Sequence, residues 1–270
     1  MKNGDTGHTV KYLQLLLNQA GLKVEQDGWF GPATEAAVKA IQARAGLVVD
    51  GIAGPKTIAA LASGDRNPKH LSEADLEKAA ERLGVPVAAI KAVNEVESRG
   101  QGFLNDGRPV ILYERHIAFR LLGESGMPFD EACALAERYP NLVSQKRGGY
   151  VGGAAEYERL ANALQILPAD IGHSACSWGQ FQIMGYHWQD LGYQSCAAFV
   201  ADMQSGEDAQ LAAFTAFILA DTALHKALKA RKWADFARIY NGPAYKDNLY
   251  DVKLARAFER HSPAQEKEAA

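Results

Sequence analysis

Helical periodicity predicts different surroundings for two carboxylates of one expected helix, Glu95 and Glu97. Ile90 and Val93 mark the apolar stripe of this helix, and Glu97 falls on the same stripe, four residues after Val93. Glu95 lies on roughly the opposite face, where solvent is expected. A carboxyl group in apolar surroundings has a raised pKa and can donate a proton to a leaving group, as cleavage of a glycosidic bond requires. The pattern makes Glu97 a candidate proton donor, and an ion pair with Arg99 or another cation is the alternative.

A second carboxylate, Glu114, follows a short apolar run at residues 110–113 that we expect to form a strand or small hairpin. Val110, Leu112 and Glu114 would share one face of that strand, which would place the carboxylate at the edge of a groove. Hydrolysis with inversion needs a carboxylate to activate water, and hydrolysis with retention needs one as nucleophile. Glu114 is the candidate for this role, and an ion pair with Arg115 or His116 is the alternative. Three other acids could replace it: Asp106, Glu156 and Asp190.

The composition is that of a globular protein and excludes several classes of function. Apolar residues make up 47% and charged residues 23% of the 270 residues, and the formal net charge of −3 does not favour a nucleic-acid binder. No segment is apolar for long enough to span a membrane, so no stable membrane insertion is expected. The first residues lack a basic stretch followed by an apolar run, so no secretory signal is visible and synthesis in the cytoplasm is expected.

No metal or cofactor is expected from the sequence. His116 has no partner at metal-ligand spacing. The three cysteines, Cys133, Cys176 and Cys196, are an odd number without C-x-x-C spacing, so buried thiols are expected. The glycine-rich stretch at 148–153 lacks the Lys-Ser/Thr of a phosphate loop and is interpreted as a mobile loop beside the groove. Trp178 is interpreted either as a platform for a sugar or as core.

An internal repeat organises the first 63 residues. The unit D-G-x-x-G-P-x-T occurs at 27–34 and again at 50–57, and each copy predicts a turn that leads into a helix beginning near the proline. An earlier helix is expected from Val10 to Ala20, with Val10, Leu13 and Leu17 on one stripe and Gly21 after its end. The result is a three-helix bundle.

A polar linker is expected at residues 64–70, followed by a mainly α-helical domain at 71–261 with a minor β-hairpin and by a polar tail at 262–270. Ser72 and Asp75 have the spacing of a capping box, and Leu71 and Leu76 that of a hydrophobic staple, at the start of this domain. Helical periodicity is clear at 154–164, 209–228 and 232–240.

Three short motifs of this domain resemble those of goose-type lysozymes and soluble lytic transglycosylases. They are Glu97-Ser98, the segment Gly179-Gln180-Phe181-Gln182-Ile183, and Tyr240-Asn241-Gly242, in that order. A longer stretch, 96–100 continuing through 107–116, resembles the phage-type N-acetylmuramidases, and the likeness covers roughly 71–261. The resemblance implies a lysozyme-like fold, Glu97 as general acid, Glu114 as the second carboxylate, and substrate contacts from Ser98, Gln180, Gln182, Tyr240 and Asn241.

The first 63 residues resemble the three-helix peptidoglycan-binding module, through Gly4-Asp5-Thr6-Gly7, Leu13-Gln14 and both repeats. Trp29 and Phe30 are interpreted equally as core or as a ligand platform. Together the resemblances imply a monomeric endolysin that binds peptidoglycan and hydrolyses the bond between N-acetylmuramic acid and N-acetylglucosamine after a separate pore admits it to the periplasm. A lytic transglycosylase and a non-catalytic wall-binding phage protein are the alternatives.

Overall fold

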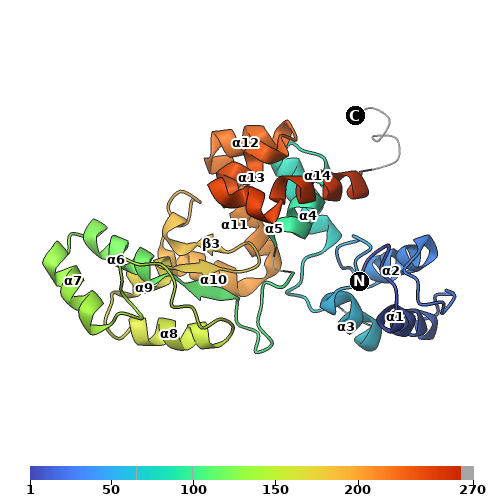
Figure 1. Cartoon of the computed structure of the whole chain (residues 1–270), viewed down its shortest axis with the longest axis horizontal. Coiled ribbons are helices and arrows are strands. Elements are labelled where there is room, and N and C mark those ends of the chain that lie inside the picture. Colours follow the sequence, from blue (N-terminus) through green and yellow to red (C-terminus); the bar gives the residue numbers. More distant parts are fainter. Residues whose placement is uncertain (65, 99, 263–270) are drawn as a thin grey trace. The chain divides into compact units, whose positions relative to one another are not determined.

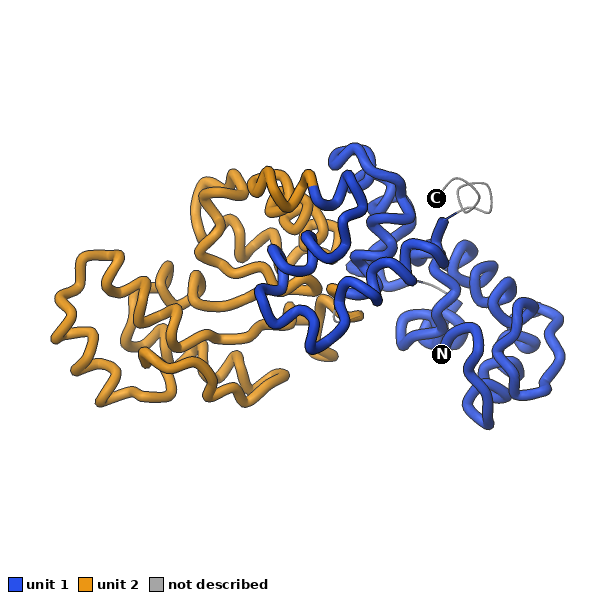
Figure 2. The backbone as a smooth tube through the Cα atoms, turned by 45° about the horizontal axis from the view of Figure 1, so that its top comes forward, with its two compact units in different colours: residues 1–96, 227–270 blue, residues 97–226 orange. Residues whose placement is uncertain are grey.

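The computed structural model describes residues 1–64, 66–98 and 100–262, so Arg99 and the predicted tail after Ser262 lie outside the described residues. The chain is mainly helical with one small sheet, as predicted (Figure 1). Contacts group it into two compact units (Figure 2). Unit 1 contains residues 1–96 and the described residues from 227 onward, and unit 2 contains residues 97–226.

Unit 1 begins with the predicted three-helix bundle of α1 (His8–Gln19), α2 (Pro32–Arg44) and α3 (Pro55–Ser63). Its core includes the predicted stripe of Val10, Leu13 and Leu17, none more than 1% exposed. Phe30 is fully buried in the same core, whereas Trp29 is 51% exposed. Phe30 therefore belongs to the core, whereas the ligand role of the exposed Trp29 stays a prediction.

Each repeat is held by a buried glutamine of the preceding helix. In the first, Gln14 Nε2 donates to Asp27 Oδ1 (2.7 Å) and to Thr34 Oγ1 (3.1 Å), while its Oε1 accepts from Gly28 N–H (2.9 Å). Gly28 has a φ of +77°, a backbone conformation that favours glycine. The side-chain amide thus satisfies the turn that precedes α2.

The second repeat uses the same arrangement one helix later. Gln42 of α2 donates to Asp50 Oδ1 (2.7 Å) and to Thr57 Oγ1 (3.2 Å), and it accepts from Gly51 N–H (2.9 Å). The repeat in the sequence is therefore a repeat of hydrogen bonds, each requiring its aspartate, glycine and threonine.

The remaining helices of unit 1 are α4 (Glu73–Leu83), α13 (Trp233–Asn241), the 3-10 helix η2 (Pro243–Asn248) and α14 (Tyr250–His261). Two helices cross the boundary between the units: α5 (Val87–Glu97), whose last residue belongs to unit 2, and α12 (Thr222–Lys229). The predicted capping box is present at α4, where Ser72 N–H donates to Asp75 Oδ2 (3.0 Å). Leu71 and Leu76, the predicted staple, are both buried.

The solvent environment expected for Glu95 on α5 was wrong. Its side chain is only 15% exposed and forms ion pairs with Arg260 and with His261 (3.0 Å) of α14, and more distantly with Lys2 (3.8 Å). Periodicity along one helix assigned this face to water because it cannot show that a helix more than 160 residues later in the sequence covers it.

Unit 2 is built around a three-stranded antiparallel sheet of β1 (Ile111–Tyr113), β2 (Cys176–Trp178) and β3 (Ile183–Met184), in that order. The strand at 110–113 was predicted, but its two partners were not. Both are too short for a periodic signal. Around the sheet lie α6 (Arg115–Glu124), α7 (Phe129–Arg138), α8 (Ala155–Ala163), α9 (Ala169–Ser174), the 3-10 helix η1 (Gly185–His187), α10 (Cys196–Ser205) and α11 (Glu207–Ala220).

The single helix predicted at 209–228 is two helices, α11 and α12, bent by 103° at the break. The Asp221 carboxylate accepts hydrogen bonds from Ala223 N–H (2.9 Å) and Leu224 N–H (3.0 Å) and so begins α12. No single helix among the described residues is long and apolar enough to cross a membrane, although this bent pair passes by length and composition.

Candidate active site

Glu97 is the last residue of α5 and is half-buried. The predicted stripe leads to it, since Ile90 is 2% and Val93 1% exposed. Beyond the helix, the Ser98 hydroxyl accepts a hydrogen bond from Gly100 N–H (3.3 Å). The carboxylate therefore stands where the packed face of α5 ends and an irregular segment begins, a position at which a side chain can reach a substrate.

Two buried polar residues of α11 hold the segment that follows Glu97. Glu207 Oε1 accepts from Gly102 N–H (2.9 Å), and Gln210 Nε2 donates to the Gly102 carbonyl (3.3 Å). Glu207 is fully buried and Gln210 is 1% exposed. A side chain at Gly102 would meet them, because an added Cβ would lie 2.2 Å from Gln210 Oε1.

Gln210 also fixes the turn that carries the predicted substrate residues. Its Oε1 accepts from Gln180 N–H (2.7 Å), and Gly179 packs so closely that an added Cβ would lie 2.4 Å from Gln210 Cδ. One side chain of α11 thus ties the segment after Glu97 to the turn between β2 and β3. The sequence reasoning missed it, although a glutamine three residues after a glutamate in an otherwise apolar helix is a visible signal.

Gln180 and Gln182, both predicted to line the sugar groove, occupy different environments. Gln180 is 2% exposed, whereas Gln182 is half-buried. The Gln182 side chain accepts from Ser177 Oγ (2.9 Å) and donates to the Gly179 carbonyl (2.8 Å), so its amide stabilises the turn. Its φ of +52° lies in a region that non-glycine residues seldom adopt and that is enriched at functional sites.

Glu114 lies between β1 and α6 with its side chain 16% exposed. The Tyr150 hydroxyl donates to Glu114 Oε2 (2.8 Å), and His116 Nδ1 lies 3.2 Å from the same oxygen. Burial lowers the pKa of His116, outweighing the raising effect of Glu114, so the imidazole is neutral at pH 7. The His116 contact also lacks hydrogen-bonding geometry. Glu114 is therefore held by a phenol and not by a cationic histidine.

Arg115, the other expected partner of Glu114, is used elsewhere. Its guanidinium donates to the carbonyls of Pro140 (2.9 Å), Lys146 (3.0 Å) and Arg147 (2.9 Å). It thus fixes the backbone that leads into the glycine-rich loop at 148–153. Four glycines of this loop have positive φ, between +57° and +91°, which accounts for the glycine content.

The three alternative acids do not match the role proposed for Glu114. Glu156 is fully buried, and its carboxylate accepts from Val151 N–H (2.7 Å) and Gly152 N–H (2.9 Å) and pairs with Arg159 (2.7 Å). It therefore anchors the loop expected to be mobile. Asp106 pairs with the guanidinium of Arg108, and Asp190 has a side chain that is 71% exposed.

Tyr240 and Asn241 lie in the last turn of α13, in unit 1, and both are half-buried. The Tyr240 ring stacks on Phe236 with ring centroids 6.0 Å apart. The other predicted site residues belong to unit 2, in which the segment 97–102, the turn at 179–182 and the entrance to α6 are each fixed by hydrogen bonds.

Trp178 and the cysteines have structural roles. Trp178 is 1% exposed and its indole N–H donates to the His173 carbonyl (3.1 Å), so the core interpretation is confirmed. Cys176 and Cys196 are buried free thiols, and burial raises the pKa of both, while Cys133 is half-buried. Within the described residues no cluster of three His, Cys, Asp or Glu side chains could hold a metal ion.

Comparison with protein families assigns both parts of the chain. The profile of the N-acetylmuramidase family matches residues 86–262, more than half of the chain. The chain belongs to the N-acetylmuramidase family. A peptidoglycan-binding domain family matches residues 6–61, which contain both D-G-x-x-G-P-x-T repeats. The resemblances to the phage-type N-acetylmuramidases and to the peptidoglycan-binding module are thereby confirmed.

One solved structure resembles this family member over nearly its whole length. The Burkholderia AP3 phage endolysin is 56% identical, with a TM-score of 0.92, and the match covers 97% of this chain and 98% of that one. Two curated relatives match shorter stretches, 29% and 23% of the chain. They are the zinc D-Ala-D-Ala carboxypeptidase of Streptomyces albus G, 38% identical over 84 residues, and the N-acetylmuramoyl-L-alanine amidase CwlL of Bacillus licheniformis, 46% identical over 66 residues. The chain spans only 33% and 18% of the lengths of these two relatives.

Proposed function

We propose that the chain is a peptidoglycan-binding endolysin that hydrolyses the bond between N-acetylmuramic acid and N-acetylglucosamine. Glu97 protonates the oxygen of the leaving sugar, and Glu114 either activates the attacking water or attacks the sugar itself. The observation that carries the proposal is the environment of Glu114, a half-buried carboxylate that accepts from the Tyr150 phenol beside a neutral histidine. A second carboxylate favours hydrolysis over transglycosylation, in which the substrate's own hydroxyl attacks.

Ser98, Gln180, Gln182, Tyr240 and Asn241 are proposed to contact the substrate. The proposed domains are a binding module at 1–63, a linker at 64–70 and a catalytic domain at 71–261. The binding module would hold the catalytic domain at a high local concentration of glycan. The proposed site of action is the periplasmic peptidoglycan, reached by a monomeric protein from the host cytoplasm through a separate pore.

The experiment replaces Glu97 by glutamine and measures the clearing of permeabilised Gram-negative cells. Loss of the proton donor should reduce the rate about 10²- to 10⁴-fold, while binding to sacculi is retained. Glu81→Gln, at an exposed position of α4, is the control and should keep wild-type activity. Unchanged lysis by Glu97→Gln would contradict the proposal and favour a wall-binding protein without this chemistry.

The products distinguish hydrolysis from the rival reaction. Mass spectrometry of digested sacculi should show reducing N-acetylmuramic acid ends. Predominance of 1,6-anhydro ends would instead identify a lytic transglycosylase and remove the role of Glu114.

A further inference from the structure

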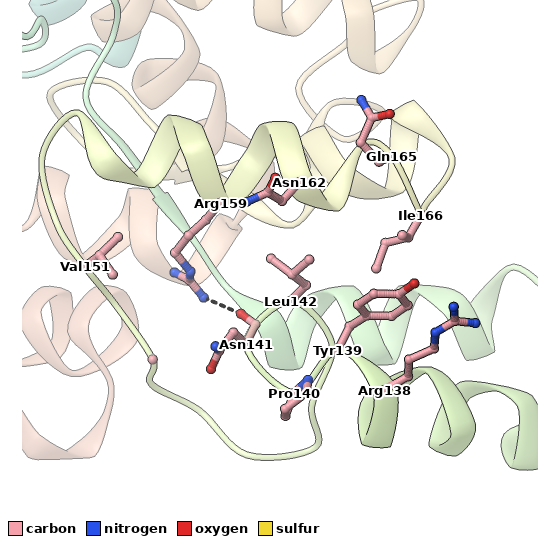
Figure 3. Close-up of a pocket in the computed structure, with 11 residues that line it drawn as sticks. Arg138, Tyr139, Pro140, Asn141, Leu142, Val151, Arg159, Asn162, Gln165 and Ile166 are labelled. Atoms are coloured by element: carbon pink, nitrogen blue, oxygen red, sulfur yellow. Dashed lines mark hydrogen bonds between the residues drawn. The ribbon is translucent and has the colours of Figure 1, made fainter.

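A cavity of about 620 Å³ lies in unit 2, away from the segments that carry Glu97 and Gln182. Its walls come from the end of α7, the segment 139–142, the glycine-rich loop, α8 and the turn after α8 (Figure 3). The volume is that of a site for a small ligand.

The lining of the cavity is mainly apolar and carries a few cationic and amide side chains. It contains Arg138 and Arg159 but no aspartate or glutamate, and the amides of Asn141, Asn162 and Gln165 contribute to it. Arg138 lies over the Tyr139 ring, 5.3 Å from its centroid, and no carboxylate of the described residues is within ion-pair distance of its guanidinium. An anion entering the cavity would therefore meet a positive charge that is not already neutralised.

Arg159 forms the rigid part of the wall. It is 7% exposed and pairs with Glu156. Its guanidinium also donates to the Asn141 carbonyl (2.9 Å), the bond drawn in Figure 3. Its Nε is buried and has no hydrogen-bond partner among the described residues. Arg159 therefore shapes the wall of the cavity, and Arg138 is the cation that remains available to a ligand.

We propose that this cavity binds the peptide stem of peptidoglycan through its free carboxylates, an inference that rests on the proposed function. The stem carries carboxylates, peptide amides and small alanine methyl groups. Guanidinium groups pair with carboxylates in defined geometry, and side-chain amides can both donate to and accept from a peptide backbone. Leu142 and Ile166, both half-buried, supply apolar contacts for the methyl groups.

The cavity and Glu114 share one loop. Gly149 and Val151 line the cavity, whereas Tyr150 between them donates to the Glu114 carboxylate. A stem peptide in the cavity therefore rests against the loop that carries the phenol partner of the second carboxylate. This position would favour glycan strands that bear peptides over bare strands.

The experiment titrates the ¹⁵N-labelled full-length chain with the synthetic stem tetrapeptide L-Ala-γ-D-Glu-meso-diaminopimelate-D-Ala and follows NMR signals. The side-chain amides of Asn162 and Gln165 should shift in a saturable manner. Arg138→Glu and Asn162→Asp, which each place a carboxylate in the cavity, should weaken that binding at least tenfold. Arg82→Glu makes the same charge change at an exposed position of α4 and should leave Kd within threefold.

Two further titrations test whether the carboxylates of the peptide are the groups that the cavity recognises. The same peptide with its carboxylates amidated should bind at least tenfold more weakly, and neutral chitotetraose should not shift these signals. Signals from residues 1–63 report separately any binding to the N-terminal module. Absence of shifts at Asn162 and Gln165, or equal binding of the amidated peptide, would overturn the proposal. Because no bond is cleaved in this titration, its outcome is independent of the lysis assay on Glu97→Gln.

Discussion

Glu97 and Glu114 differ in what fixes them in place. Glu97 is positioned by the packed stripe of α5, whereas Glu114 follows a three-residue strand and is held by one hydrogen bond from Tyr150. Burial and this hydrogen bond raise the pKa of Tyr150, so the phenol stays protonated and remains a donor at neutral pH. Tyr150 is thus a positioning residue for the second carboxylate.

Tyr150→Phe should lower kcat about tenfold and leave KM nearly unchanged, because it removes one hydrogen bond to a charged group, worth about 1.5 kcal/mol. Steady-state kinetics on solubilised peptidoglycan measure both constants. Tyr193→Phe removes a comparable bond, from a phenol to Asp202 (2.6 Å) in the same unit, and should keep wild-type kcat. Equal losses in the two variants would mean that Tyr150 acts only through stability.

At the scale of elements, α11 is the support of the candidate site. Its two buried polar residues, Glu207 and Gln210, bind backbone groups of the segment after Glu97 and of the turn at 179–182. These backbone groups lie in irregular structure, so without α11 they would be buried and unsatisfied. The site therefore depends on a helix that contributes none of the proposed catalytic groups.

Gln210→Ala should destabilise the protein by about 1–3 kcal/mol, since it leaves Gln180 N–H and the Gly102 carbonyl without this partner. Urea unfolding measures the loss, and activity should fall under conditions where the variant is still folded. Gln189→Ala, at an exposed position of the same unit, is the control. A variant with wild-type stability and activity would show that this amide does not support the site.

The sequence predicted those elements whose signal is local. The three N-terminal helices, the capping box of α4 and the stripe leading to Glu97 each follow from periodicity and from residues close in the chain. The strands β2 and β3 are too short for a periodic signal. The pairing of β1 with β2 and the cavity beside α8 depend on contacts between distant segments, so they could not be predicted. The break at Asp221 was visible as a capping residue, but the apolar period on both sides outweighed it.

Candidate site residues show the same limit. Periodicity placed Glu97 on the stripe of Ile90 and Val93 and Glu95 in solvent, because it could not supply the partners of Glu95 on α14. The resemblance supplied Glu114, yet Tyr150 was visible only as one residue of a glycine-rich stretch. Tyr150 and Glu114 are 36 residues apart, and a single sequence gives no signal for a contact between residues so far apart.

At the scale of the whole molecule, Glu95 joins both ends of the chain within unit 1. It is paired with Lys2 near the first residue and with Arg260 and His261 at the end of α14. Burial alone would raise the pKa of Glu95, but the hydrogen bond from His261 and the charges of Arg260 and Lys2 outweigh it and lower the pKa. The folded state therefore binds a proton here less readily than the unfolded chain does.

The stabilisation that ionised Glu95 contributes should therefore be fully present above the pKa of a glutamate in the unfolded chain, about 4.3. It should be lost as the pH falls through the lower pKa that Glu95 has in the folded protein. Glu95→Gln should cost about 1–3 kcal/mol at pH 7, and the difference from wild type should shrink below pH 4. Urea unfolding across pH 3–7 measures it. Glu25→Gln, at an exposed position, should show little difference at any pH. A difference in unfolding free energy between Glu95→Gln and wild type that stays constant across this pH range would refute the stabilising role of the Glu95 ion pairs.

The buried glutamines of the N-terminal module have a consequence for its evolution and its redesign. Gln14 and its aspartate are 13 residues apart and Gln42 and its aspartate only 8, so the same bond forms across connections of different length. Each helix carries the side-chain amide that the following turn requires, so one repeat unit can be connected directly to the next. The series stops at α3, whose nine residues include no glutamine. A third copy would therefore require a glutamine that α3 does not have.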